Sequence, residues 1–172
     1  ELMSMDHWDV YFDNDEDLLR AKKEQLTDVL KTLPWVAVID QFQQWIYTNP
    51  THNANERETA FQEIYTRFGA GFANWSGLET EFGNGWQKQL HLFEVPFYYI
   101  EYAIAQLGAI AVWKNYKANP KRGLQQYLAA LALGYTKPMN EIYETAGIKF
   151  EFSAAYVKEI AEFVKEELQQ IG

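Results

Sequence analysis

Apolar side chains recur every three to four residues along most of the chain, which is the spacing of an amphipathic helix. Strand-like alternation is nearly absent, and the best candidate, 148–152, reads better as an extended connection. The fold class is therefore predicted to be all-α, a multi-helix array of about seven helices, with 1–172 forming a single helical segment. The predicted helices cover 15–33, 35–47, 55–68, 96–117, 123–133, 138–146 and a last segment that follows Ser153.

Prolines and glycines mark the expected ends of these helices. Pro34 is expected to stop or kink the first one, and Pro96 fits the first position of a later one. The segment 69–85 holds five of the 10 glycines and is predicted to be a loop. The helix over 96–117 is apolar nearly all round, so we expect it to be central and buried.

Composition and charge exclude several classes of function. The net charge of −9, with no basic cluster, disfavours binding to nucleic acids and to anionic membranes. The longest apolar run, 103–113, is too short to span a bilayer. The chain has no cysteine and no visible signal peptide, so disulfides and thiolate metal sites are excluded and the cytoplasm is the expected location.

The most distinctive chemistry lies around a single histidine. His91 stands just before a predicted helix that opens with Tyr98, Tyr99 and Tyr102. Tyrosines three and four positions apart share a helix face, and phenols and an imidazole can donate hydrogen bonds to an oxyanion or a peptide carbonyl. Two interpretations stay open: a set of residues that clamps a substrate, or tyrosine rings packed in the core with their hydroxyls at its rim.

Other catalytic chemistries lack their motifs. The three histidines, His7, His52 and His91, form no H-E-x-x-H pair, and no Glu-x-x-His sequence is present. We therefore expect no metal ligand in this chain. A G-x-S-x-G nucleophile motif is also missing, which leaves serine hydrolysis unsupported.

Several segments together resemble one family. The segments 1–8, 33–37, 42–47, 91–103, 133–138 and 146–148 are similar, in order, to the C-terminal part of the catalytic domain of oligoendopeptidase F-like zinc metallopeptidases, the family that includes thimet oligopeptidase. The stretch from His91 to Tyr102 is the most specific of these matches. The resemblance covers essentially the whole chain.

This resemblance implies a part of a larger zincin-like helical domain that hydrolyses short peptides with zinc. It implies that His91, Tyr99 and Tyr102 are catalytic contacts to the substrate and its oxyanion, with Tyr98 as a further substrate-binding residue; it leaves open whether Tyr98 or Tyr99 faces the substrate. The H-E-x-x-H motif is absent, so the chain alone is expected to bind no zinc and to be inactive. Glu1 as the family's zinc-ligand glutamate is an alternative that fits the surrounding residues less well.

The chain does not begin with Met, and we expect a fragment. Its expected partners are short peptides and the missing N-terminal part of the same enzyme. Apolar surface meant for that part leads us to expect a homodimer. The alternative function is a non-catalytic all-α binding or scaffolding module. An in-frame H-E-x-x-H within about 40 residues upstream would favour the peptidase.

Overall fold

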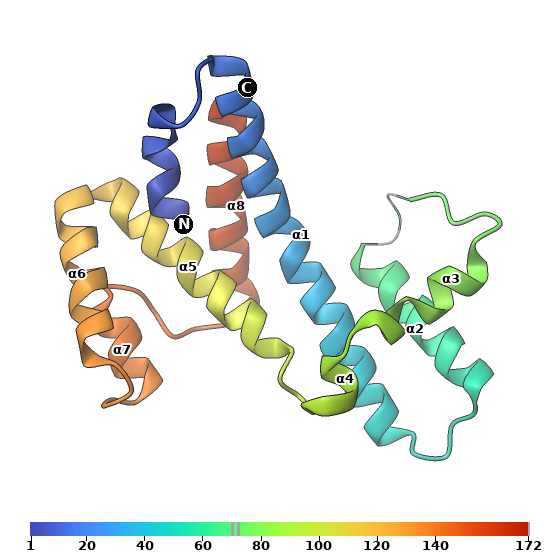
Figure 1. Cartoon of the computed structure of the whole chain (residues 1–172). Helices are drawn as coiled ribbons and strands as arrows, with labels where there is room; N and C mark the ends of the chain where they lie inside the picture. The colour runs from blue at the N-terminus through green and yellow to red at the C-terminus, as the bar shows by residue number, and fades with distance from the viewer. Residues whose placement is uncertain (70, 72, 172) are drawn as a thin grey trace. The chain divides into compact units, whose positions relative to one another are not determined.

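The computed structural model describes residues 1–69, 71 and 73–171, and every regular element within those ranges is a helix (Figure 1). The all-α prediction is confirmed. In chain order the elements are η1 (Leu2–Val10), α1 (Asp15–Thr48), α2 (Ala54–Phe68), α3 (Glu79–Asn84), η3 (Gly85–Lys88), α4 (His91–Glu94), α5 (Ile100–Ala118), α6 (Pro120–Leu133), α7 (Met139–Thr145) and α8 (Ala154–Ile171), of which η1 and η3 are 3-10 helices.

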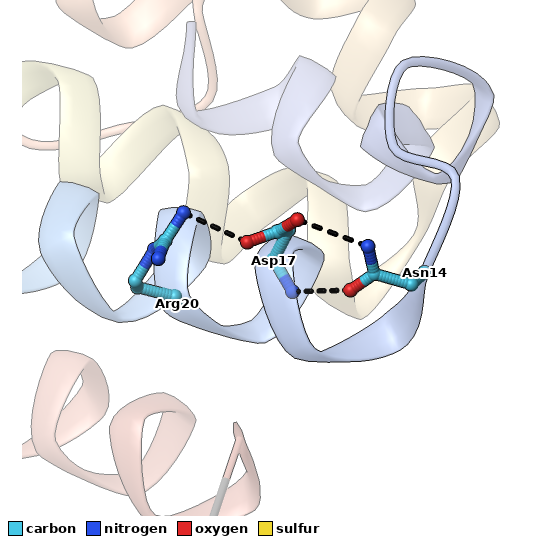
Figure 2. A network of polar contacts seen from close by, with 3 residues as sticks. All are labelled: Asn14, Asp17 and Arg20. Carbon is cyan, nitrogen blue, oxygen red and sulfur yellow. Dashed lines mark hydrogen bonds and ion pairs between the residues drawn. The ribbon is translucent and has the colours of Figure 1, made fainter.

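Side chains just before and within its first turn hold the start of α1 (Figure 2). The Asn14 Oδ1 atom accepts a hydrogen bond from the Asp17 backbone N–H at 2.9 Å, and the Asn14 amide nitrogen donates to the Asp17 carboxylate at 2.9 Å. Arg20 pairs with the same carboxylate at 2.7 Å. Asn14 thus satisfies one of the N–H groups that a helix leaves free at its N-terminus, and the acidic first turn favours the helix dipole.

Of the two outcomes predicted for Pro34, the stop is wrong, because the segments 15–33 and 35–47 belong to one helix, α1, which continues through Pro34 to Thr48. Proline removes one backbone hydrogen bond, the one to the Leu30 carbonyl, at a cost of about 3 kcal/mol. Val29 and Val36, on either side, are buried almost completely. Each such side chain contributes about 1.5–3 kcal/mol, so burial along α1 offsets the proline.

Residue contacts divide the chain into two compact units. Unit 1 consists of 1–30 and 104–172, and unit 2 of 31–103. The helices α1 and α5 each contribute to both units. No helix of the described residues combines the length and the apolar content that crossing a membrane requires.

Unit 1 is built around Trp113, whose ring lies edge-on to Phe163 with centroids 5.0 Å apart. A Cβ atom at Gly123 would stand 2.6 Å from the Tyr116 Cα, so the close approach of α6 to the end of α5 requires glycine there. The core of this unit is completed by the buried side chains of Leu2, Met5, Leu26, Val29, Leu107, Ile110, Ala111, Ala130, Ala146, Tyr156, Ile160 and Val164.

Unit 2 has an aromatic core that supports the candidate site. Phe42 of α1 meets Phe61 of α2 edge-on, with centroids 5.0 Å apart, and Trp86 lies 5.4 Å from Phe42. Asn53 and Glu56 form a reciprocal capping box that begins α2. The cluster consists of Val38, Ile39, Phe42, Phe61, Ile64 and Trp86, and partly buried hydrophobic residues including Trp35, Leu92 and Tyr99 pack against it.

Several predicted boundaries differ from the structure. The segment 69–85, of which residues 70 and 72 lie outside the described part, contains α3 and the start of η3. The helix expected from Pro96 begins instead at Ile100, and its N-terminal turn is largely exposed although Leu107, Ile110 and Trp113 are buried. The predicted helices of α2, α7 and α8 are confirmed. The Ser153 hydroxyl accepts the Tyr156 N–H at 3.2 Å, as expected for a cap.

Candidate functional site

His91 is the first residue of α4, a single helical turn in unit 2. The next residue, Leu92, packs against the aromatic core and so anchors this turn. The Val95 N–H donates to the His91 carbonyl at 3.1 Å and closes the turn. His91 itself is half-buried, and its ring extends toward the residues that open α5.

A reversal of the backbone separates α4 from α5. Phe97 has a φ of 60°, in the left-handed region that costs a residue with a side chain about 1–2 kcal/mol. Its N–H donates to the Oε1 atom of Gln43 at 2.8 Å, and the Tyr98 N–H donates to the Val95 carbonyl at 3.2 Å. This conformation is the physical reason that no helix runs on from Pro96.

The reversal brings all four candidate residues together within unit 2. The Nε2 atom of His91 lies 2.9 Å from the Tyr102 hydroxyl. The His91 ring lies parallel to that of Tyr98, with centroids 6.0 Å apart, and is met edge-on by Tyr99 at 5.1 Å and by Tyr102 at 5.4 Å. These are the four side chains that the sequence singled out, and a turn between α4 and α5 brings His91 to the tyrosines.

The three tyrosines differ in their surroundings. Tyr98 and Tyr102 are 47% and 40% exposed. Tyr99 is half-buried, packs on the aromatic core and accepts a hydrogen bond from the Trp35 indole nitrogen at 3.1 Å. Burial raises the pKa of the Tyr99 hydroxyl, the Trp35 hydrogen bond lowers it in part, and the neighbouring Tyr102 raises it further. Tyr99 therefore stays protonated at neutral pH.

The surroundings of the second ring nitrogen of His91, Nδ1, favour one of the two tautomers of the neutral imidazole. The Nδ1 atom is buried and has no hydrogen-bond partner among the described residues. A buried N–H without a partner is rare and costs about 1–3 kcal/mol. The favoured neutral form therefore carries its proton on Nε2 and donates it to the Tyr102 oxygen, which leaves the Tyr102 O–H free to point elsewhere.

Two residues that support the site, Trp35 and Gln43, could not be recognised from the sequence. Both lie within a predicted helix, and nothing in their spacing connects them with His91. Gln43 did carry a signal, because it follows Val36 and Ile39 at helical spacing and so puts an amide on an apolar face.

The described residues do not fit a metal centre. They contain no group of three or more His, Cys, Asp or Glu side chains arranged to hold a metal ion. The other two histidines are engaged elsewhere: the His7 Nε2 atom lies 3.2 Å from the Tyr116 hydroxyl, and His52 accepts a hydrogen bond from Arg57 at 2.9 Å. Glu1, the alternative zinc ligand, belongs to no such group either.

Comparison with known proteins gives one family and two solved structures. Peptidase family M3 matches residues 1–162. An oligoendopeptidase F structure is 29% identical over 90% of this chain and 27% of its own, with a TM-score of 0.78. A PZ peptidase A structure with an inhibitor is 30% identical over 90% of this chain and 28% of its own, with a TM-score of 0.77. The chain thus spans just over a quarter of each structure. No curated protein matches it.

Proposed function

Because the chain belongs to Peptidase family M3, we propose that it supplies the substrate-binding part of a zinc metalloendopeptidase that hydrolyses short peptides. The family match confirms the resemblance predicted from the sequence. A chain without cysteine suits a reducing compartment, and we place the enzyme in the cytoplasm.

The convergence of His91 with Tyr98 and Tyr102 carries this proposal. Hydrolysis of a peptide bond places negative charge on the carbonyl oxygen of the substrate, and fixed hydrogen-bond donors stabilise that charge. The two tyrosine rings are partly exposed and lie within 6.0 Å of the imidazole, measured between ring centroids. A substrate carbonyl that approaches this cluster would meet donors already held in place.

The hydrogen bond between His91 and Tyr102 affects how strongly the Tyr102 hydroxyl can donate its own hydrogen bond. With its proton on Nε2, the imidazole donates to the Tyr102 oxygen and polarises the phenol. The Tyr102 O–H then becomes a better donor toward an oxyanion. We assign Tyr102 as the residue that contacts the oxyanion and His91 as the residue that orients it and makes it a stronger donor.

Tyr98 and Tyr99 receive different roles in this proposal. Tyr98 is the more exposed of the two and stacks on His91, so we assign it a contact to the substrate backbone. The oxygen of Tyr99 already accepts the Trp35 N–H, and its ring packs on the core. Tyr99 keeps one hydroxyl proton to donate, but its main contribution is to fix the residues that open α5.

Exposed apolar side chains lie close to the donors along the chain. A short peptide offers both backbone carbonyls and side chains, so a surface that combines phenolic donors with apolar groups suits it. The neighbouring exposed side chains are Leu90, Phe93, Val95, Phe97 and Ile100.

The hydrolytic step itself is not assigned to this chain. Its described residues form no site for zinc, so we propose that they bind, orient and stabilise charge, and we expect the chain alone to be inactive. The family alternative, in which Glu1 ligates the zinc, would require partners that these residues do not provide.

Replacement of Tyr102 in the complete peptidase tests the proposal. Tyr102→Phe removes one donor and is expected to lower kcat on a fluorescence-quenched octapeptide by about 100-fold while KM changes little. Tyr135→Phe is the matched control, because Tyr135 is fully exposed and lies in unit 1. Equal kcat values for the two variants would contradict the role of Tyr102.

A further inference from the structure

Gln43 is the one polar side chain that is fully buried among the described residues, with 2% of its surface exposed. Its Oε1 atom accepts the Phe97 N–H at 2.8 Å. Its Nε2 atom is also buried and has no hydrogen-bond partner among those residues. A methionine of similar size would avoid the unpaired amide, so packing alone does not explain a glutamine at this position.

The backbone that Gln43 holds is in an unfavourable conformation. Phe97 is the single non-glycine residue of the described part with a positive φ, at 60°. A second residue of α1 also contacts it, because the Tyr47 and Phe97 ring centroids lie 5.0 Å apart. Gln43 and Tyr47 are four positions apart, on one face of α1. One helix face thus holds both the backbone and the ring of Phe97.

The reversal at Phe97 determines the distance between His91 and Tyr102. These residues are 11 positions apart in the chain, and their side chains lie 2.9 Å apart. In an uninterrupted helix, residues with that separation would stand about 16 Å apart along the axis. The hydrogen bond therefore exists only because the chain turns back between α4 and α5, at the residue that Gln43 holds.

We propose that Gln43 is a positioning residue of the candidate site: its amide holds the Phe97 backbone and so sets the approach of Tyr102 to His91. This inference rests on the proposed function, in which those two residues handle the substrate oxyanion. The Gln43 amide forms no hydrogen bond with either residue in the described part of the chain, so it acts through the turn. A small displacement of catalytic groups can cost about 100-fold in rate, so the role is measurable.

Two measurements test the proposal, with Gln43→Met as the main variant. In this chain, NMR gives the nuclear Overhauser effect between the His91 and Tyr102 rings and the hydrogen exchange of the Phe97 amide. In the complete peptidase, kcat and KM are measured on the fluorescence-quenched octapeptide. Gln44→Met is the matched control, because Gln44 is the next residue and is exposed, with its amide bonded to Asp40 at 2.8 Å.

We expect Gln43→Met to weaken the ring-to-ring signal, to speed exchange of the Phe97 amide and to lower kcat by about 10- to 100-fold with KM nearly constant. The added substitution Phe97→Gly should restore part of kcat, because glycine adopts a positive φ without strain. A glutamine that only fills space would not be rescued in this way. The control should leave all readouts unchanged.

The outcomes separate this inference from the proposed function. If the unmodified peptidase does not cleave short peptides, the proposed function is wrong, and the NMR measurements still decide whether Gln43 holds the turn. If the enzyme is active and Gln43→Met changes neither the ring contact nor kcat, the positioning role is wrong. Should the variant not fold, fast exchange of the Phe97 amide in the unmodified chain would overturn the proposal, and slow exchange would support it.

Discussion

The indole nitrogen of Trp35 donates a hydrogen bond to the hydroxyl of Tyr99 at 3.1 Å, across 64 positions of the chain. Trp35 is itself held by aromatic contacts, edge-on to Tyr65 at 5.4 Å and to Phe61 at 6.5 Å. The bond therefore ties the residue before α5 to the core of unit 2. Tyr98 and Tyr102, the exposed tyrosines of the candidate site, lie on either side of Tyr99 in the sequence.

Loss of the Trp35 donor should destabilise unit 2. We expect Trp35→Phe to lower the free energy of unfolding by about 1 kcal/mol more than Trp75→Phe does, as measured by urea denaturation. Trp75 is a suitable control, because its indole nitrogen is buried without a partner among the described residues and its ring also packs on Tyr65. A double-mutant cycle with Tyr99→Phe isolates the bond, and a coupling energy of zero would contradict it.

The raised pKa of Tyr99 predicts a stability change at alkaline pH. Burial, the largest cause, lifts the pKa of the folded state above the ordinary value of 10.0. The protonated phenol then stabilises the fold fully below pH 10.0, and this contribution is lost as the pH rises through the folded-state pKa. Tyr99→Phe should therefore reduce the loss of stability in that window. Urea denaturation between about pH 9 and 12 measures it, and NMR titration of the Tyr99 Cζ resonance at or below 10.0 would refute the prediction.

The choice between Tyr98 and Tyr99 can be made by kinetics. We expect Tyr98→Phe to lower kcat/KM on short peptides by about tenfold, with little effect on the free energy of unfolding. Tyr99→Phe should do the reverse, because its oxygen accepts the Trp35 bond and its ring packs on the core. A larger kinetic effect at Tyr99 would restore it to the catalytic role that the resemblance implies.

Self-association of the chain is expected from its exposed apolar side chains. Leu124, Leu128 and Leu131 of α6 are 44%, 54% and 58% exposed and recur at helical spacing. Sedimentation velocity should show a dimer that forms as concentration rises, and Leu128→Glu should shift it toward monomer. A monodisperse monomer at every concentration would rule out the predicted homodimer.

Part of the fold could be predicted because its signals are local. The apolar spacing predicts α2, and Ser153, whose hydroxyl accepts a backbone N–H of the first turn, marks the start of α8. The boundaries that were wrong depend on distant contacts. Burial of Val29 and Val36 carries α1 through Pro34, and no local rule weighs that gain against the proline.

The sequence singled out the four candidate side chains, which the structure brings together, but it did not indicate how the backbone brings them together. His91 and the three tyrosines stood out because donors gather in a short stretch. The left-handed Phe97 did not, since φ above zero is unfavourable for phenylalanine and depends here on Gln43, 54 positions away. The positive φ of Phe97 depends on an amide far away in the sequence, so the spacing of apolar residues around Phe97 does not reveal it.

The support of the turn by α1 has a consequence for how such a site could diverge. The side chains that hold Phe97 and Tyr99, at Trp35, Gln43 and Tyr47, belong to one helix, whereas the exposed apolar groups near the donors belong to the segment 90–100. On the proposed function, exchanges at Ile100 are expected to alter which peptides are preferred while the donors stay in place. Substrate preference could therefore change during evolution while the α1 side chains that position the tyrosine hydroxyls are kept.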